Sequence, residues 1–384
     1  MSKIADVTSL APAAAMRAML QRIATGPDLS KPLSQTEACY GMQLILDGAA
    51  DPVQAAIFLI ALRMKRETAE ENRGVLDAIR AATETVHVAV DDLVDLADPY
   101  NGYARTLPAA AFLPAVLSAC AIPTVSHGVW SMGPKFGVTH AQVLAAAGVD
   151  TQLSSVAAAR QVEGPAAWAY LGQHMFCSKL FALERLRTQI VKRPVITTVE
   201  VLARPLLASG RAHLVTGYVH KPYPPVYTML ARHVGFDSCL LLRGTEGGVI
   251  PSLRQPGKAV RFYRGELDEE LDLSPQECAI TQSLRAAPVP DSVLQSAADP
   301  GVPDGPAFSV EALARAAACA GLDALAGAHG PVRDGLVYAA AHIVNHVTKR
   351  DDVQRCAREV RAVLDDGRAA ERFQLAQGLS PQVH

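Results

Sequence analysis

The sequence has few aromatic residues and almost no net charge. Aromatic residues make up 5% of the chain, and 36 lysines and arginines against 38 acidic residues give a net charge of −2. A near-neutral chain has no overall field to draw it onto nucleic acid or an acidic membrane, so such a partner would need a local basic patch. The 384 residues, 49% of them hydrophobic, are enough for two domains with a sizeable core.

Paired cysteines and targeting segments are also missing. The seven cysteines are scattered and none are spaced Cys-x-x-Cys, which argues against a disulfide framework or a structural zinc site. Residues 1–17 lack the basic start and apolar core of a signal peptide. Residues 107–130 carry no charge, but Pro108, Pro114 and Pro123 interrupt them, which favours a buried helix and strand over a membrane span. We therefore expect a cytoplasmic protein with no membrane partner.

Start signals and alternating patterns predict an N-terminal helical domain followed by an α/β domain. Ser34 to Glu37 and Thr68 to Glu71 have the form of capping boxes, so residues 1–93 should form a helical bundle. Residues 94–384 alternate between short apolar runs and helical patterns, as in a three-layer α/β domain. The sequence predicts strands at 195–201 and 239–242, helices at 110–119, 143–147, 225–232, 331–347 and 352–364, and a surface loop at 286–307.

Several separate segments resemble the anthranilate phosphoribosyltransferase family, in order and over most of the chain. The stretches that carry the resemblance are 33–38, 45–48, 54–59, 61–68, Ser126-His127-Gly128 with Lys135-Phe136-Gly137, and Gly330-Pro331-Val332-Arg333-Asp334. The resemblance implies a nucleoside-phosphorylase-like α/β domain beside the helical domain, with residues 180–210 packing back on the helices. It also implies a homodimer formed through the N-terminal helices.

The motifs with which that family binds its substrates differ here. A gap-free count from His127 places the family's Gly-Thr-Gly-Gly-Asp pyrophosphate loop on 98–102 and its Asn-Ile-Ser-Thr segment on 108–111, which reads Pro-Ala-Ala-Ala. The family's magnesium-binding Asp-Glu pair falls on Val249 and Ile250, whose apolar side chains cannot ligate magnesium, while Glu246 is a weak substitute. We therefore expect no magnesium, no other cofactor and no metal site.

Residues 99–105, Pro-Tyr-Asn-Gly-Tyr-Ala-Arg, resemble the YbiB-like branch of the family, which is associated with nucleic-acid binding. Residues 179–221 are locally basic, either as a phosphate-binding wall or as an ordinary surface whose arginines pair with distant acids. His127 is either a structural residue or a group that contacts phosphate or transfers a proton. The candidate ligand-binding residues are Tyr100, Asn101, Gly102, Arg105, His127, Gly128, Ser131, Lys135, Arg187, Lys192 and Arg193.

Two functions from different classes, with a structural scaffold as a third, are compatible with this pattern. The first is a protein that binds nucleic acid or another phosphorylated ligand in the cleft between the domains. The second is a glycosyl or phosphoribosyl transferase, a pentosyltransferase with an altered donor or acceptor. No catalytic residue is assigned for it from the sequence.

Overall fold

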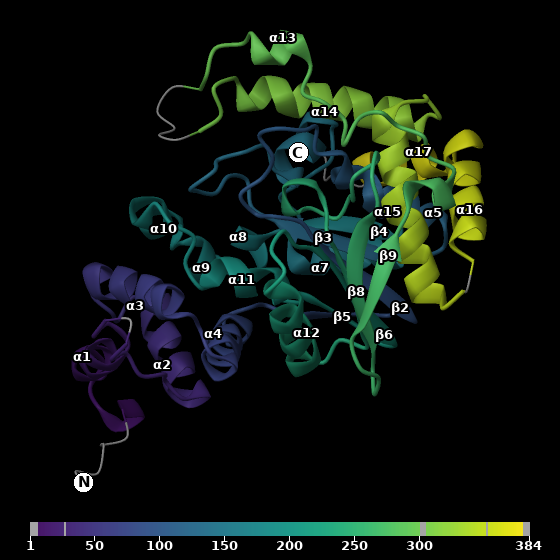
Figure 1. Ribbon diagram of the computed structural model, residues 1–384. Helices are drawn as coiled ribbons and strands as arrows, with labels where there is room; N and C mark the ends of the chain where they lie inside the picture. Colours follow the sequence, from purple (N-terminus) through teal and green to yellow (C-terminus); the bar gives the residue numbers. More distant parts are fainter. Residues whose placement is uncertain (1–6, 27, 300–304, 351, 379–384) are drawn as a thin grey trace.

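The chain folds into a helical domain and an α/β domain that lie side by side (Figure 1). The computed structural model describes residues 7–26, 28–299, 305–350 and 352–378. Both predicted capping boxes are confirmed, because Ser34 with Glu37 and Thr68 with Glu71 exchange side-chain and backbone hydrogen bonds at helix starts. A short 3-10 turn (Val7–Ser9) precedes the N-terminal helices α1 (Pro12–Ile23), α2 (Gln35–Leu46), α3 (Pro52–Lys65) and α4 (Ala69–Ala81).

A later stretch of short helices returns to the helical domain, where α10 contacts α3 and α11 contacts α4. These helices are α8 (Gln173–Phe176), α9 (Ser178–Phe181), α10 (Glu184–Ile190) and α11 (Ile196–Val199). The predicted strand at 195–201 is therefore wrong, since α11 and a 3-10 turn (Glu200–Leu202) occupy it. Most of its β-branched residues are buried near α4, and within the described residues no strand pairs with them, so packing overrides their β-propensity.

The α/β domain is built on a seven-stranded sheet with the order β4-β3-β2-β6-β7-β8-β9. Neighbouring strands from β4 to β7 are parallel, whereas β8 and β9 are antiparallel. The strands are β2 (Asp92–Ala97), β3 (Thr124–Gly128), β4 (Trp168–Gly172), β6 (Arg211–Gly217), β7 (Ser238–Leu242), β8 (Gly257–Tyr263) and β9 (Glu269–Leu273). A separate parallel pair joins β1 (Val86–Val88) to β5 (Leu206–Ala208). Thus β1 and β2 both begin before residue 93, the expected domain boundary.

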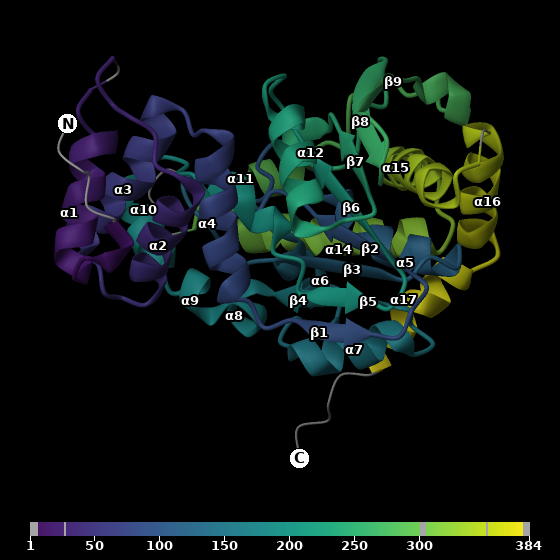
Figure 2. The ribbon, with the colours of Figure 1, turned by 90° about the horizontal axis from the view of Figure 1, so that it is seen from below.

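Helices cover both faces of this sheet, which gives the expected three layers (Figure 2). Along β2, Val94 and Leu96 enter one core cluster while Leu93 and Ala97 enter the other, because side chains alternate along a strand. One layer contains α5 (Leu113–Ala119), α6 (His140–Ala146), α14 (Val310–Leu325), α15 (Pro331–Thr348), α16 (Val353–Asp365) and α17 (Arg368–Gly378). The other contains α7 (Ser155–Glu163), α12 (Tyr223–Val234) and the helical domain.

The remaining predictions about the fold have mixed outcomes. The strand at 239–242 and the helices at 110–119, 143–147, 225–232, 331–347 and 352–364 are confirmed to within a few residues, whereas α17 was not predicted. Part of the predicted loop at 286–307, residues 300–304, lies outside the described residues, and its described part contains α13 (Asp291–Leu294). In the described parts of the chain, no helix has both the length and the apolar character needed to cross a bilayer.

Candidate functional site

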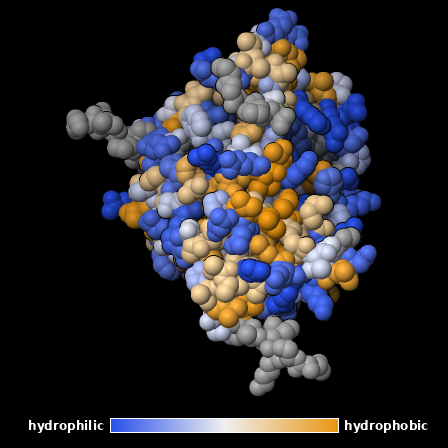
Figure 3. Space-filling view, turned by 90° about the vertical axis from the view of Figure 1, so that its left-hand side faces the viewer, coloured by the Kyte–Doolittle hydropathy of each residue, from blue (hydrophilic) through white to orange (hydrophobic). Residues whose placement is uncertain are grey.

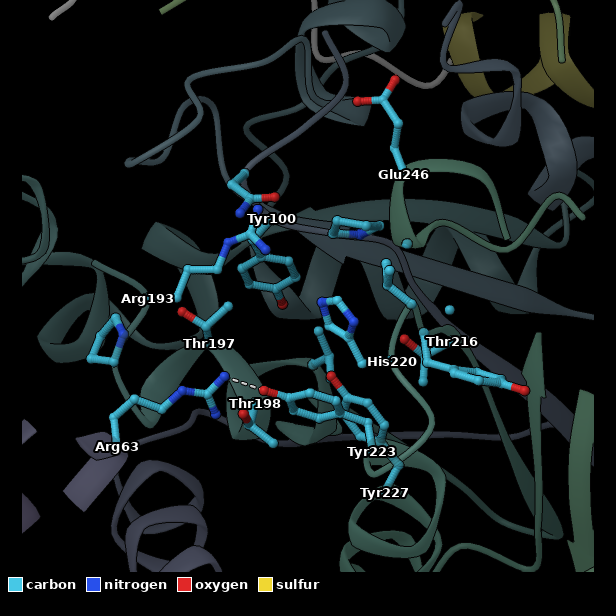
Figure 4. A pocket seen from close by; sticks show the side chains of 18 residues that line it. Arg63, Tyr100, Arg193, Thr197, Thr198, Thr216, His220, Tyr223, Tyr227 and Glu246 are labelled. Atoms are coloured by element: carbon cyan, nitrogen blue, oxygen red, sulfur yellow. Dashed lines mark hydrogen bonds between the residues drawn. The ribbon is translucent and has the colours of Figure 1, made fainter. Parts of the chain in front are cut away.

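A pocket of about 170 Å³ opens over the carboxyl ends of β2 and β6, between the two domains (Figure 4). From β2 the chain proceeds outward to β3 and β4, then returns to place β6 on the other side of β2. The carboxyl ends of two strands whose connections diverge in this way form the usual binding crevice of an open α/β sheet. Residues 99–101 after β2, residues 216–218 at the end of β6 and Arg63 of α3 all contribute to the pocket wall.

A buried hydrogen-bond chain runs from the pocket wall into the sheet. The Tyr100 hydroxyl bonds to His127 Nδ1, and His127 Nε2 lies 2.8 Å from Asp95 Oδ1. Burial raises the pKa of Tyr100 well above its usual value, so the phenol donates, and His127 in turn donates to the Asp95 carboxylate. The suggested contact of His127 with a phosphate therefore conflicts with the structure, because the ring is buried and both nitrogens are bonded. These contacts agree with the other interpretation, in which His127 is a structural residue.

The loop after β2 is held by an internal carboxylate. Asp98 Oδ1 accepts a hydrogen bond from the Val249 backbone N–H at 3.1 Å, and Asp98 Oδ2 accepts one from the Tyr103 hydroxyl. His140 Nε2 lies 2.8 Å from the same Oδ2 atom. A side chain at Gly248 would place its Cβ only 1.8 Å from the Tyr103 hydroxyl, so only glycine fits beside this ring.

Glu246 links a second loop to the first. Its carboxylate accepts hydrogen bonds from the backbone N–H groups of Ala104 at 3.1 Å and Arg105 at 2.9 Å, and from the Thr106 hydroxyl at 3.0 Å. Lys135 Nζ forms an ion pair with it and also donates to Gly102 O at 2.6 Å. Burial acts to raise the pKa of Glu246, but Lys135 and the backbone donors lower it overall. Glu246, the candidate metal ligand, is thus engaged by protein donors, as is Lys135 by protein acceptors.

The predicted cationic residues divide into buried and exposed groups. Arg187 is 2% exposed and makes two 2.7 Å hydrogen bonds to Glu200, so its predicted phosphate contact conflicts with the structure. Arg193 lines the pocket, and the Asn101 amide oxygen, turned toward it, accepts from Arg193 Nε at 3.0 Å. Arg105 and Lys192 are exposed, and neither forms an ion pair within the described residues.

The other predicted site residues lie in the loops and at the strand end around this pocket. Gly102 has a φ of 70° that favours glycine, and its carbonyl oxygen accepts a hydrogen bond from Lys135 Nζ. Gly128 is buried at the end of β3, against the ring of Tyr100, and Ser131 follows in the next loop, half-buried. The structure therefore brings Tyr100, Asn101 and Arg193 together in the pocket wall, with Gly102, Gly128 and Lys135 beneath or beside them.

The basic stretch at 179–221 is partly an ordinary paired surface. Lys179 pairs with Asp47, Arg187 with Glu200 and Arg211 with Asp92, while Arg204 donates to backbone carbonyls. In contrast, no ion pair is formed within the described residues by Arg185, Lys192, Arg193 or Lys221. Of the cations of this stretch, only these four could therefore bind an anionic ligand without first losing an ion pair or a backbone hydrogen bond to another described residue.

Arg63, Thr198 and Tyr227 are among the pocket residues that sequence reasoning missed. Arg63 reaches from α3 and donates to the Tyr223 hydroxyl, which joins the two domains across the pocket (Figure 4). It belongs to a segment that resembles the family, but its helical context gave no sign that it faces a cleft. Thr198 and Tyr227 lie on helices, one of which was predicted as a strand.

Comparisons with known proteins agree with this architecture. Residues 17–83 match the helical bundle domain of the glycosyl transferase family. The chain is 28% identical over 360 residues to an anthranilate phosphoribosyltransferase of Methylocella silvestris, covering 93% of each chain. It is also 29% identical over 227 residues to an uncharacterized protein of Aquifex aeolicus, covering 58% of this chain and 66% of that one.

Solved structures of anthranilate phosphoribosyltransferases share the fold. The enzyme from Thermus thermophilus superposes with a TM-score of 0.72 at 19% identity, covering 94% of this chain and 98% of that chain. The Saccharomyces cerevisiae enzyme in complex with 4-fluoroanthranilate gives a TM-score of 0.75 at 15% identity, covering 95% and 97%.

Proposed function

We propose that this anthranilate phosphoribosyltransferase-like protein binds a phosphorylated ligand, nucleic acid above all, in the cleft between its two domains. The observation that carries the proposal is the pocket at the β2 and β6 ends, which is lined by the exposed Arg193 and the partly exposed Tyr223. Arg63, also in the wall, pairs with Glu67 and donates to the Tyr223 hydroxyl, and Tyr100 is buried. Guanidinium groups bind phosphate, and tyrosine rings stack on bases without selecting a sequence. This combination suits a sugar-phosphate chain with unpaired bases.

The cations available to such a ligand are fewer than the sequence predicts. Arg105, Lys192 and Arg193 are exposed and have no ion pair among the described residues, so phosphate does not have to displace an acid from them. Lys135 is neutralised by Glu246, and Arg187 by Glu200. We therefore assign phosphate contact to the first three residues and a supporting role to the other two.

A loss of phosphoribosyl pyrophosphate chemistry is part of the proposal. By the resemblance to the family, Asp98 falls in the pyrophosphate loop, and Val249 takes the place of one residue of the magnesium-binding pair. Here the Asp98 carboxylate accepts from the Val249 N–H, and Glu246 occupies the backbone donors at 104 and 105. Internal carboxylates thus occupy backbone donors that could otherwise bind a pyrophosphate. This supports a ligand other than phosphoribosyl pyrophosphate. The YbiB-like affiliation stays a prediction.

A second candidate is a transferase with an altered donor or acceptor, favoured by the chain Tyr100–His127–Asp95 beneath the pocket. A histidine can take a proton from a neighbouring group, and the buried carboxylate behind it stabilises the imidazolium that forms. Release of pyrophosphate or free base from a panel of phosphoribosyl donors and nucleosides, reduced in Tyr100→Phe, would support this candidate over the binding protein.

Fluorescence anisotropy with a labelled single-stranded oligonucleotide at several salt concentrations tests the binding proposal. Affinity should fall steeply with salt, because each neutralised phosphate releases counterions. The double variant Lys192→Ala with Arg193→Ala should flatten the logarithmic salt slope by about 1.4, at about 0.7 per phosphate of a single strand. Arg358→Ala, which removes an exposed arginine of α16, is the matched control. Absence of binding even at low salt would refute the nucleic-acid proposal.

A further inference from the structure

A second cavity lies away from the cleft, on the other side of the α/β domain. It measures about 440 Å³ and is formed by the β8–β9 hairpin and by α15 and α16. Tyr263 in its wall pairs with Ser238, the first residue of β7, so the wall reaches the amino end of the parallel strands. The cleft pocket lies over the carboxyl ends. The volume is within the range of sites that hold small molecules.

A buried histidine of this wall has an unused nitrogen. His342 is 8% exposed, and its Nε2 atom has no hydrogen-bond partner within the described residues. One helical turn away on either side, the Tyr338 hydroxyl and His346 Nδ1 are equally without partners there. An unpaired polar atom in the interior costs stability, and a ligand atom that bonds to His342 would recover part of it.

Tyr263 provides a fixed platform for cations at one end of the cavity. Its ring stacks on His346 with centroids 4.8 Å apart, and its hydroxyl donates to the His346 carbonyl at 3.0 Å. Lys349 Nζ lies 4.3 Å from the ring centroid and the Arg261 guanidinium 5.5 Å from it. Arg261 pairs with Glu269, whereas Lys349 forms no ion pair in the described part of the chain.

Of the three acidic residues in the wall, Asp272 pairs with Lys258, whereas Glu266 and Glu277 form no ion pair within the described residues. Glu266 lies in the turn between β8 and β9, where its backbone N–H donates to the Tyr263 carbonyl at 2.9 Å, and it lines the cavity at that end. Glu277 lies in the 3-10 turn Pro275–Cys278 that follows β9, at the other end of the hairpin, and it also lines the cavity. Within the described ranges, neither Glu266 nor Glu277 has an ion-pair partner, so the wall presents one free cation and two free carboxylates.

These charges select a ligand class. A simple anion would meet Glu266 and Glu277, a simple cation would meet Lys349, and a neutral amino acid would leave one carboxylate unpaired. A ligand with one carboxylate and two separated cationic groups complements all of them. We propose that this cavity binds a basic α-amino acid, with its carboxylate on Lys349, its α-ammonium on Glu266 and its side-chain cation on Glu277.

Three matched probes test the proposal on the intact chain. L-lysine carries every required group, L-norleucine lacks the side-chain ammonium, and cadaverine lacks the carboxylate. A ligand that binds only the folded state raises the melting temperature in a saturable way. We expect L-lysine to raise it at millimolar concentration. Calorimetry should show at least about tenfold weaker binding for the other two probes, a difference of about 1.4 kcal/mol.

Two variants locate the site. Glu277→Gln should remove the preference for L-lysine over L-norleucine, and Lys349→Met should remove the preference for L-lysine over cadaverine. Glu311→Gln, an exposed acid of α14, should leave both preferences unchanged. No saturable shift with L-lysine, L-ornithine or L-arginine would overturn the proposal, as would equal responses to the three probes. The comparison of probes on the unmodified protein decides the question even where a variant fails to fold.

Discussion

Mild acid should destabilise the α/β domain through buried histidines of α15. His346 Nε2 and His213 Nδ1 each lie 2.7 Å from Ser238 Oγ, and His213 Nε2 lies 2.8 Å from Asp92 Oδ1. His213 must therefore donate to Asp92 and accept from Ser238, whose oxygen accepts from His346. This order leaves His346 Nδ1 unprotonated, and it has no partner within the described residues. Burial lowers the pKa of His346 to about 3 and that of His342 to about 4.

The sign and size of the effect follow from these values. Both folded-state pKa values lie below the value of about 6.5 expected in the unfolded chain, so the unfolded state binds more protons as the pH falls. The stability is fully present above pH 6.5 and is lost progressively until the pH reaches the folded-state values. Between pH 7 and pH 5 each histidine should lower the free energy of unfolding by about 2 kcal/mol. The pair would remove about 4 kcal/mol from a typical total of about 5–15 kcal/mol.

Urea denaturation at pH 7, 6 and 5, followed by the fluorescence of buried Trp168, measures this loss in the α/β domain. His342→Leu removes a histidine whose Nε2 makes no hydrogen bond, and it should reduce the loss between pH 7 and pH 5 by about 2 kcal/mol. His87→Gln changes an exposed histidine and should leave the loss unchanged. If His342→Leu loses as much stability as the parent protein, burial of a neutral histidine is not the cause.

Three further predictions concern the cleft and the assembly. Calorimetry should detect no magnesium-dependent binding of phosphoribosyl pyrophosphate, since Val249 and Ile250 stand in the place of the acidic pair; micromolar binding would contradict this. The face in Figure 3 shows apolar residues gathered over the helical domain, and Val53, Ile57 and Met64 of α3 are exposed. We expect sedimentation to show a homodimer through these helices, which Met64→Glu weakens; a strict monomer at micromolar concentration would exclude it. Glu246→Ala should lower the free energy of unfolding by about 1–3 kcal/mol, because it strands the backbone donors that the carboxylate satisfies, and an unchanged denaturation midpoint would count against that role.

The architecture could be predicted from the sequence where local signals and packing agree. Ser34 and Thr68 cap helices as expected, and the alternation along β2 matches a sheet covered on both faces. The prediction failed at 195–201, where β-branched residues suggested a strand. Whether such a run pairs with a strand or packs as a short helix depends on its neighbours in space, and α4 lies far from it in the sequence. Arg63 was missed for the same reason, since its partner Tyr223 is on another domain.

The contrast between Arg187 and Arg193 shows why a site cannot be counted from basic residues alone. They lie close together in the sequence and both belong to the predicted phosphate wall. Arg187 is enclosed and donates through both terminal nitrogens to Glu200, which is itself buried, so removing Arg187 would leave the Glu200 carboxylate buried and unpaired. Arg193 is exposed beside Asn101, where water and ligand can compete for it. Arg187→Ala should therefore impair folding before it affects any ligand, whereas Arg193→Ala should weaken binding in a protein that melts at nearly the same temperature. Equal melting temperatures with weaker binding in both variants would show that Arg187 reaches the ligand after all.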